Sequence, residues 1–91
     1  MATSFKKDPD AILDYTVDWT EWLSAIADTI TTSVWILDPS VTAVSDSHTG
    51  TKATVFISGG TMETSVVITN RITTVGGRTD DRSITLKIVS R

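Results

Sequence analysis

The sequence predicts an all-β domain, and three observations carry that prediction. Between Glu63 and Val89, two runs of alternating apolar and polar side chains flank a polar connection, and such alternation is typical of antiparallel strands with one buried face. The connection contains Gly76-Gly77, which predicts a hairpin. Strand signals recur about every ten residues elsewhere, and this spacing favours a sandwich or a small barrel over a parallel α/β fold.

The alternation also assigns the inward-facing side chains of this hairpin. They are Val66, Ile68, Asn70 and Ile72 in the first run and Ile84, Leu86 and Ile88 in the second. Asn70 is the polar member of the set. A buried amide is tolerated when hydrogen bonds satisfy it, so we expect Asn70 to bond to backbone groups of an adjacent loop or strand.

The domain begins with a predicted strand from Ile12 to Thr20 that has one wet face. Its apolar face consists of Leu13, Tyr15, Val17 and Trp19. The segment from Trp19 to Ala27 allows two interpretations: a short amphipathic helix with Thr20 as its N-cap, or a strand end followed by a turn. Trp19 and Trp22 would project to opposite faces of a strand, so we expect one in the core and the other at the surface.

Thr29 to Leu37 is rich in residue types that fit a pleated sheet and stops at Asp38-Pro39, which predicts a second strand. Trp35 lies within this strand, and we expect its side chain to fill the core between the two sheets.

Two further segments complete the series. We expect Val41 to Val44 to form a short strand or a sheet edge and Ser45 to Gly50 to form a polar loop. The next strand ends at Gly59-Gly60 and has Phe56 on its outer side. Its inward face consists of Ala53, Val55 and Ile57.

Composition restricts the class of protein. The chain has 91 residues, a formal net charge of -3 and no cysteine, which predicts one domain without disulfides or a cysteine-based metal framework. The acidic balance argues against sequence-independent binding of duplex nucleic acid, which needs a basic stripe. Met1 to Asp10 leads into no apolar stretch, so we expect neither a signal peptide nor a membrane span, and a complete small reading frame.

Charged residues gather late in the chain. Aspartates at 80 and 81 are interleaved with Arg71, Arg78, Arg82 and Arg91. We expect a solvated loop with local ion pairs here.

The sequence offers no candidate for catalysis. His48 is the single histidine and lies in the polar run Ser45 to Thr49, where we expect an ordinary loop histidine, because sequence neighbours are rarely arranged as nucleophile, base and orienting carboxylate. The paired carboxylates do not resemble an EF-hand, although a cation held across inter-strand loops is an open alternative. We therefore expect a protein that is not an enzyme, with no catalytic residue, metal ligand or cofactor.

The N-terminus suggests a separate role. We expect residues 1–10 to form a flexible arm and residues 11–91 to form the folded domain, because Pro9 disfavours helix and Phe5 is the one large apolar anchor. Such an arm orders on a neighbouring subunit through Phe5, with Lys6 and Lys7 supplying contacts that weaken with salt. A mobile tail without a role is the alternative.

Exposed aromatic side chains commonly mark interfaces. With Trp22 and Phe56 added to the arm, the candidate partner-binding residues are Phe5, Lys6, Lys7, Trp22 and Phe56. A sugar-binding platform would also use exposed tryptophans and is the second interpretation of the aromatic residues.

Two segments resemble a known family. Lys7 to Trp19, with the sequence KDPDAILDYTVDW and followed by Trp22-Leu23, is similar to the opening of a family of small tailed-phage and prophage proteins that includes fibre-tail adaptor proteins. Thr69 to Thr74 and Gly77 to Ser83, TNRITT and GRTDDRS, resemble its close. The resemblance covers roughly Lys7 to Val89 and implies an immunoglobulin-like antiparallel β-sandwich of about seven strands.

The resemblance further implies a non-enzymatic structural or adaptor component of a tailed-phage particle. Its expected partners are other phage structural proteins, in particular tail or fibre components, together with further copies of itself in the assembled particle, and neither nucleic acid nor membrane. It would be made in the host cytoplasm and reside in the virion. A carbohydrate- or cell-surface-binding module is the alternative function.

Overall fold

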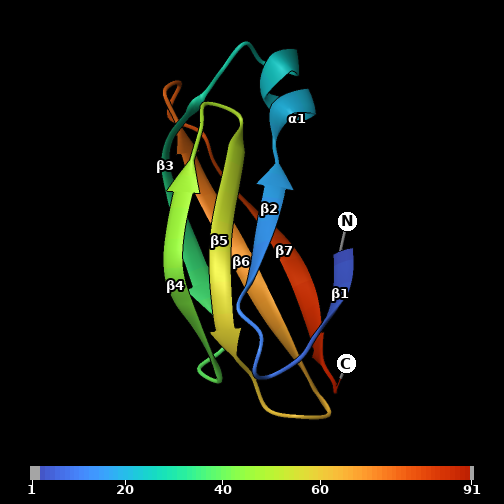
Figure 1. Ribbon diagram of the computed structural model, residues 1–91. Helices are drawn as coiled ribbons and strands as arrows, with labels where there is room; N and C mark the ends of the chain where they lie inside the picture. Colours follow the sequence, from blue (N-terminus) through green and yellow to red (C-terminus); the bar gives the residue numbers. More distant parts are fainter. Residues whose placement is uncertain (1–2, 91) are drawn as a thin grey trace.

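The computed structural model describes residues 3–90, which form two packed β-sheets and one short helix (Figure 1). In chain order the elements are β1 Thr3–Lys7, β2 Leu13–Asp18, α1 Thr20–Ala25, β3 Ile30–Leu37, β4 Val41–His48, β5 Lys52–Gly59, β6 Thr64–Thr74 and β7 Thr79–Ile88. The larger sheet has the order β1-β7-β6-β3, and the smaller sheet has the order β2-β5-β4. The predicted all-β sandwich is confirmed.

The strand order is that of an immunoglobulin-like sandwich. In that fold the second, fifth and fourth strands share one sheet, and the third, sixth and seventh strands share the other, as they do here. β1 joins the larger sheet and pairs in parallel with β7, from Thr3 opposite Ile84 to Lys7 opposite Ile88. The sandwich is therefore antiparallel except for this one pairing among the described strands.

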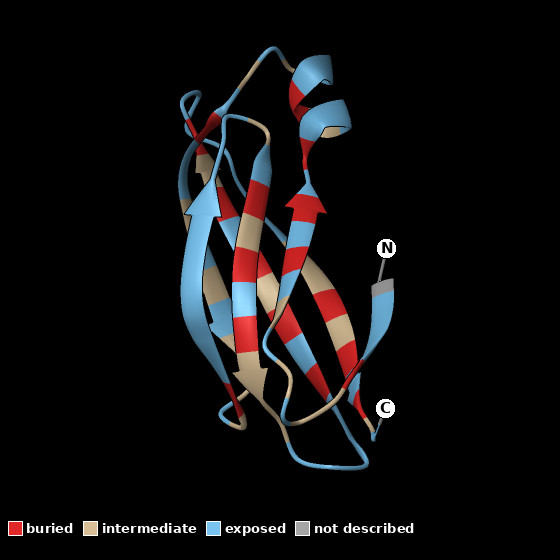
Figure 2. Ribbon diagram, viewed as in Figure 1, coloured by how far each residue is buried: buried red, intermediate tan, exposed pale blue. Residues whose placement is uncertain are grey.

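The predicted hairpin is confirmed in β6 and β7. The two strands pair from Thr64 opposite Ile88 to Thr73 opposite Thr79. All seven side chains assigned to its inward face are buried (Figure 2). Gly76 lies in the turn, where an added Cβ would stand 2.7 Å from Asp28 Oδ2, so a larger residue at this position would displace the Asp28 carboxylate.

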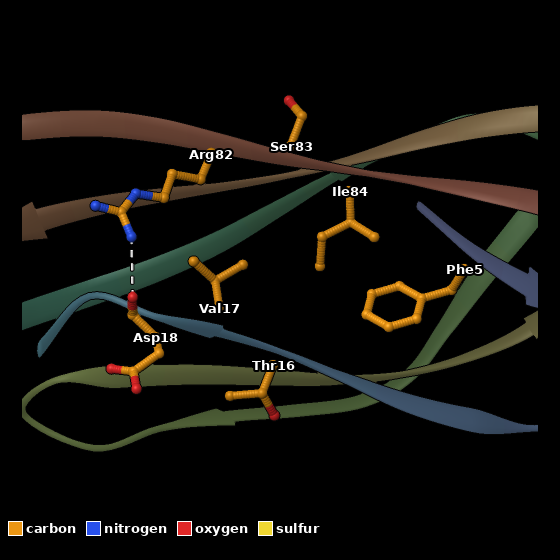
Figure 3. A pocket seen from close by; sticks show the side chains of 7 residues that line it. All are labelled: Phe5, Thr16, Val17, Asp18, Arg82, Ser83 and Ile84. Carbon is orange, nitrogen blue, oxygen red and sulfur yellow. Dashed lines mark hydrogen bonds between the residues drawn. The ribbon is translucent and has the colours of Figure 1, made fainter. Parts of the chain in front are cut away.

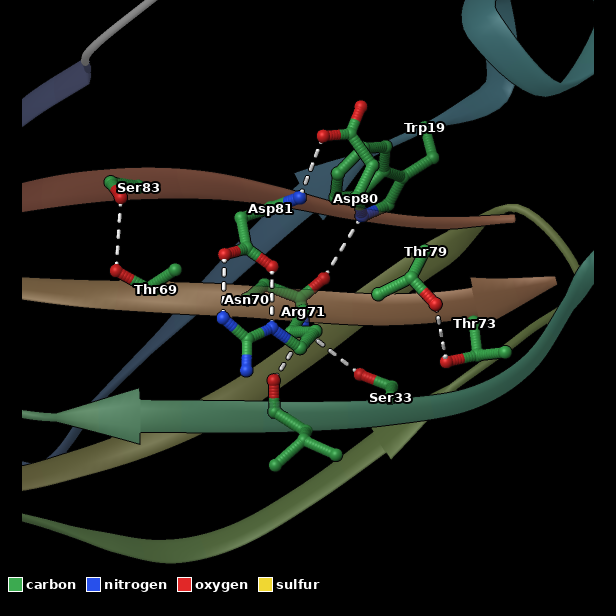
Figure 4. A network of polar contacts seen from close by, with 11 residues as sticks. Trp19, Ser33, Thr69, Asn70, Arg71, Thr73, Thr79, Asp80, Asp81 and Ser83 are labelled. Carbon is green, nitrogen blue, oxygen red and sulfur yellow. Dashed lines mark hydrogen bonds and ion pairs between the residues drawn. The ribbon is translucent and has the colours of Figure 1, made fainter. Parts of the chain in front are cut away.

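Asn70 is fully buried and hydrogen-bonded, as predicted, although only one of its three partners is a backbone group. Its Oδ1 accepts from Trp19 Nε1 at 2.9 Å, and its Nδ2 donates to Ser33 Oγ at 2.9 Å and to the Val34 carbonyl at 3.1 Å (Figure 4). Trp19 is itself fully buried. One amide thus ties the end of β2 to the two strands β6 and β3 of the opposite sheet.

The segment after β2 forms a helix, α1, which decides between the two interpretations in favour of the helix. Thr20 is its first residue rather than its N-cap; the N-cap is Trp19, which makes no side-chain capping bond. Instead, Asp18 Oδ1 accepts the Thr20 N–H at 2.9 Å. Leu23 is fully buried, so packing on the core stabilises a helix too short to form alone.

β4 is longer than predicted, because Ser45 to His48 continue the strand instead of forming a loop. A register shift between Ala43 and Ser45 against β5 marks a bulge at Val44. The bulge inserts one residue and so breaks the alternation on which the prediction relied. Every residue of β4 after Val41 is exposed. The sequence of this strand therefore lacks the alternation of apolar and polar residues that a buried face produces.

Trp35 lies on the inward-facing side of β3, but it is half-buried rather than part of the fully buried core. β3 is an edge strand of the larger sheet, so neighbours in the sheet cover Trp35 from one side. Trp19, at the end of β2, is the fully buried tryptophan of the described residues.

The late charged cluster forms ion pairs, as predicted, although Asp80, Asp81 and Arg82 belong to β7 and not to a loop. Arg71 makes a two-pronged contact with Asp81 across β6 and β7, at 2.8 and 3.0 Å. Both side chains are well exposed, so this pair contributes little to stability. Arg91 lies outside the described residues.

Asp28 joins the loop after α1 to the β6–β7 turn. Its Oδ1 accepts the N–H groups of Thr29 and Gly76, and its Oδ2 accepts Arg78 Nη1 at 2.9 Å. The Thr74 hydroxyl, followed by these donors, lowers the pKa of Asp28 to about 2. A carboxyl whose pKa is lowered by folding stabilises the fold above its unfolded pKa, and this contribution is lost as the pH falls toward the folded value.

We therefore expect wild-type stability to fall between about pH 4 and about pH 2, with Asp28 as one of the responsible groups. Asp28→Asn should melt below the wild type at pH 7, and the difference should shrink as the pH approaches 2. Thermal unfolding followed by circular dichroism across this range measures it. Asp46→Asn, at an exposed position of β4, is the matched control. A gap between Asp28→Asn and wild type that stays constant with pH would contradict the assignment.

Candidate functional site at the open edge of the sandwich

The sandwich is open along part of one side. β7 runs from Thr79 to Ile88, whereas β1 pairs only with its second half, from Ile84 onward (Figure 1). Within residues 3–90 no strand pairs with Thr79–Ser83 on the β1 side. β2 is the neighbouring edge strand of the smaller sheet, so two strand edges flank this opening.

The backbone of β7 presents hydrogen-bonding groups to the opening. Successive residues of a strand direct their N–H and C=O groups to alternate sides. Val89 N–H donates to the Lys7 carbonyl on the β1 side, whereas the Arg78 carbonyl accepts from Thr74 N–H on the β6 side. By this alternation Thr79 and Asp81 direct their backbone groups toward the opening. The Asp81 N–H donates a hydrogen bond to Oδ1 of the preceding residue, Asp80, at 2.8 Å.

A pocket of about 400 Å³ lies within this opening. It is lined by Phe5, Thr16, Val17, Asp18, Arg82, Ser83 and Ile84 (Figure 3). Val17 and Ile84 are inward-facing residues of opposite sheets and are nearly buried. Phe5 and Arg82 lie at opposite ends of the pocket in Figure 3. The pocket therefore offers an apolar floor with one aromatic end and one charged end.

Arg82 is held in place at the charged end. Its Nη1 donates to the Asp18 carbonyl at 2.9 Å, and its guanidinium carbon lies 4.3 Å from the centroid of the Trp19 ring. This is a cation–π geometry. The Thr20 hydroxyl and N–H lower the pKa of Asp18, to which Lys52 and Arg82 add smaller effects. The Asp18 carboxylate is accordingly charged at neutral pH, beside the guanidinium.

β1 closes the aromatic end, and this differs from the flexible arm expected for residues 1–10. Phe5 packs its ring 5.4 Å from that of Tyr15, although 44% of Phe5 remains exposed. Lys7 is fully buried, and its Nζ donates to the carbonyls of Asp8 at 2.9 Å and Gly59 at 2.7 Å. These long-range contacts make Thr3–Lys7 a strand of the sandwich. Residues 1 and 2 lie outside the described residues.

The ammonium of Lys7 is not placed for the salt-sensitive partner contact that the sequence suggested. Burial lowers the pKa of Lys7, while the nearby carboxylates of Asp8 and Asp10 raise it. Both of its recorded bonds go to carbonyls of the same chain. Lys6, the preceding residue, is exposed on β1.

The five predicted site residues do not come together. Trp22 lies on α1, half-buried, with its ring 5.6 Å from that of Trp19. Phe56 is exposed on the outer face of the smaller sheet, opposite Asp14 and Ser45 on the neighbouring strands. Phe5 is the one member of the set that lines the pocket. Phe5, Trp22 and Phe56 thus lie on three different elements, β1, α1 and β5.

Arg82 is the pocket residue that sequence reasoning missed, although a signal was present. The alternation that places Ile84, Leu86 and Ile88 inward also places Arg82 inward, two residues earlier. A charged side chain at an inward-facing position indicates an opening in the core.

Other kinds of site leave no trace in the described part of the chain. Across residues 3–90 no group of three or more histidine, cysteine, aspartate or glutamate side chains could hold a metal ion. His48 is exposed at the end of β4 and not in a loop. No helix in the same range is long and apolar enough to cross a membrane.

Comparison with known proteins gives one result. A family model described as "Podophage GP4 fiber-tail adaptor protein gp77" matches residues 7–87. The match runs from the last residue of β1 to the penultimate residue of β7. No curated protein matches the chain.

Because β1 is a strand of the sandwich, we expect its loss to destabilise the domain. Phe5→Ala should reduce the free energy of unfolding by about 2 kcal/mol, less than a fully buried phenylalanine would cost. Removal of residues 1–7 should reduce it further, because β7 and Tyr15 lose their cover. Chemical denaturation measures both effects.

Ser4→Ala, at an exposed position of the same strand, is the matched control and should change stability by less than about 0.5 kcal/mol. If the truncated chain melts at the wild-type temperature, the result would contradict a stabilising role for β1 and support the flexible arm that the sequence predicted.

Proposed function

Because the chain belongs to the podophage GP4 fiber-tail adaptor family, we propose that it is a non-enzymatic structural part of the virion that joins tail and fibre proteins through protein–protein contacts. The observation that carries this proposal is the match over residues 7–87, which spans β2 to β6 completely and most of β7. Membership of this family also supports synthesis in the host cytoplasm followed by incorporation into the particle.

The fold suits such a role. The sandwich is elongated, with extents of 42 × 23 × 18 Å, and α1 and the β6–β7 turn lie at one end, away from the β5–β6 connection at the other (Figure 1). A rigid body of this shape separates two contact surfaces. Many copies in a particle reinforce one another, so each contact can be weak on its own.

Exposed apolar side chains offer contact area on both sheets. Val34 and Ile36 of β3 and Val67 of β6 are between 44% and 53% exposed. Phe56 supplies similar area on the smaller sheet, at 42% exposed. Apolar area on two separate faces supports contacts with more than one neighbour.

The proposal is tested with the purified chain and the tail and fibre proteins of the same phage. We expect the chain to bind each of them separately and to bridge them in a ternary complex, measured by size-exclusion chromatography with light scattering. Particles assembled without the chain should lack fibres in electron micrographs. Direct binding of the fibre protein to the tail with the chain absent, or binding of the chain to neither protein, would contradict the adaptor role.

A further inference from the structure

We propose that an extended segment of a neighbouring virion protein adds as a strand along Thr79–Asp81 of β7, beyond the part of this edge that Thr3 of β1 reaches, and inserts an apolar side chain into the pocket beside Val17 and Ile84. This inference rests on the proposed function, because it takes a tail or fibre protein as the partner. It assigns the surface and the chemistry that such a partner would use.

The first reason is the unpaired edge. Thr79 and Asp81 direct their backbone groups toward the opening, and no described strand covers them. An uncovered strand edge is a template for another extended backbone, and strand addition is a common mode of peptide recognition. Asp80 bonds the Asp81 N–H at present, so an incoming carbonyl would replace one side-chain acceptor.

The second reason is continuity with β1. β1 occupies the same edge of β7 from Ile84 onward and pairs with it in parallel. Its alternate residues Phe5 and Lys7 face inward, toward Tyr15 and toward the Gly59 carbonyl. The fold thus already accommodates a strand on this edge that inserts an apolar side chain and then a basic one.

The third reason is the shape of the pocket. Its floor consists of Val17 and Ile84, and Phe5 closes one end (Figure 3). A strand laid on Thr79–Asp81 would direct every second side chain toward this space. One of them meets apolar surface from three strands, which selects an aliphatic or aromatic residue.

The charges at the other end suggest the next inward residue of the partner. Asp18 lines the pocket, and the alternation of β7 places the exposed Asp80 on the same face as Arg82, two residues earlier. Arg82 is already engaged by the Asp18 carbonyl and the Trp19 ring. A lysine or arginine next to the apolar anchor would complement the two carboxylates, as the chain's net charge of -3 also favours.

Other open edges and a second copy are the competing possibilities. β3 and β4 each have an open edge, but each carries a bulge, between Ile30 and Thr32 in β3 and at Val44 in β4, a device that hinders strand addition. Two copies paired antiparallel through Thr79–Ser83 would place Asp81 against its own equivalent, and like charges directly opposite are unfavourable.

Two variants test the proposal, with tail and fibre proteins of the same phage as separate probes. Asp81→Pro removes an N–H that points to the opening and leaves those that point to β6. Val17→Phe fills the pocket. Each should weaken binding of one of the two probes at least about tenfold, a change of 1.4 kcal/mol, and leave the other probe unaffected.

Matched controls separate the edge from its surroundings. Arg71→Ala loses the same ion pair as Asp81→Pro without touching the edge, and Val44→Phe adds a ring at an exposed position of β4. Both should bind as the wild type does. Melting temperatures of all four variants establish that each is folded. If Val17→Phe does not fold, the binding of Asp81→Pro alone decides the test.

Amide hydrogen exchange on the wild-type complex gives a readout that needs no variant. The amides of Thr79 and Asp81 should become protected when the probe binds, while those along the open edge of β4 should not. Unchanged binding by Asp81→Pro, or protection of β4 in place of β7, would overturn the strand-addition site and leave the adaptor role intact. Binding of neither probe by the wild type would overturn both. A wild-type dimer that Asp81→Pro dissociates would assign the edge to a second copy and overturn this proposal.

Discussion

The buried hydrogen bond between Trp19 and Asn70 is the contact on which the arrangement of the two sheets depends. Trp19 directly follows β2 of the smaller sheet, as the N-cap of α1, and Asn70 lies in the middle of β6 in the larger sheet. Asn70 also bonds Ser33 and Val34 of β3. A single side chain therefore connects β6 to β3 and to the residue that follows β2, and leaving any of these buried groups unpaired would cost about 1–3 kcal/mol.

Trp19 also connects these buried hydrogen bonds to the proposed binding edge. Its ring carries the Arg82 guanidinium on one side and packs against Trp22 of α1. Arg82 in turn bonds the Asp18 carbonyl, so it spans the gap between β7 and β2 at the point where β1 no longer covers it. The opening is held by fixed groups at both ends, and its shape is available before a partner arrives, which reduces the ordering cost of binding.

Sequence reasoning succeeded where alternation and burial coincide. The hairpin of β6 and β7 and the buried, bonded state of Asn70 followed from a pattern of period two. It failed where tertiary contacts override the pattern. β1 contains Lys7, whose burial depends on the distant Gly59 carbonyl, and β4 has a bulge and no buried residue after Val41. The pocket was missed because it requires β1 to pair with β7 and Arg82 to face inward, and the sequence pattern predicted neither the pairing of residues 3–7 nor an inward-facing arginine.

The most direct test of this account is a double-mutant cycle between Trp19→Phe and Asn70→Ala, with free energies of unfolding from chemical denaturation. The account predicts a coupling energy of about 1–3 kcal/mol, because each change removes the same buried bond. A parallel cycle of Trp19→Phe with Thr69→Ala, whose hydroxyl bonds Ser83 on the outer face, should be additive within about 0.5 kcal/mol. A coupling near zero between positions 19 and 70 would contradict the claim that this bond holds the two sheets together.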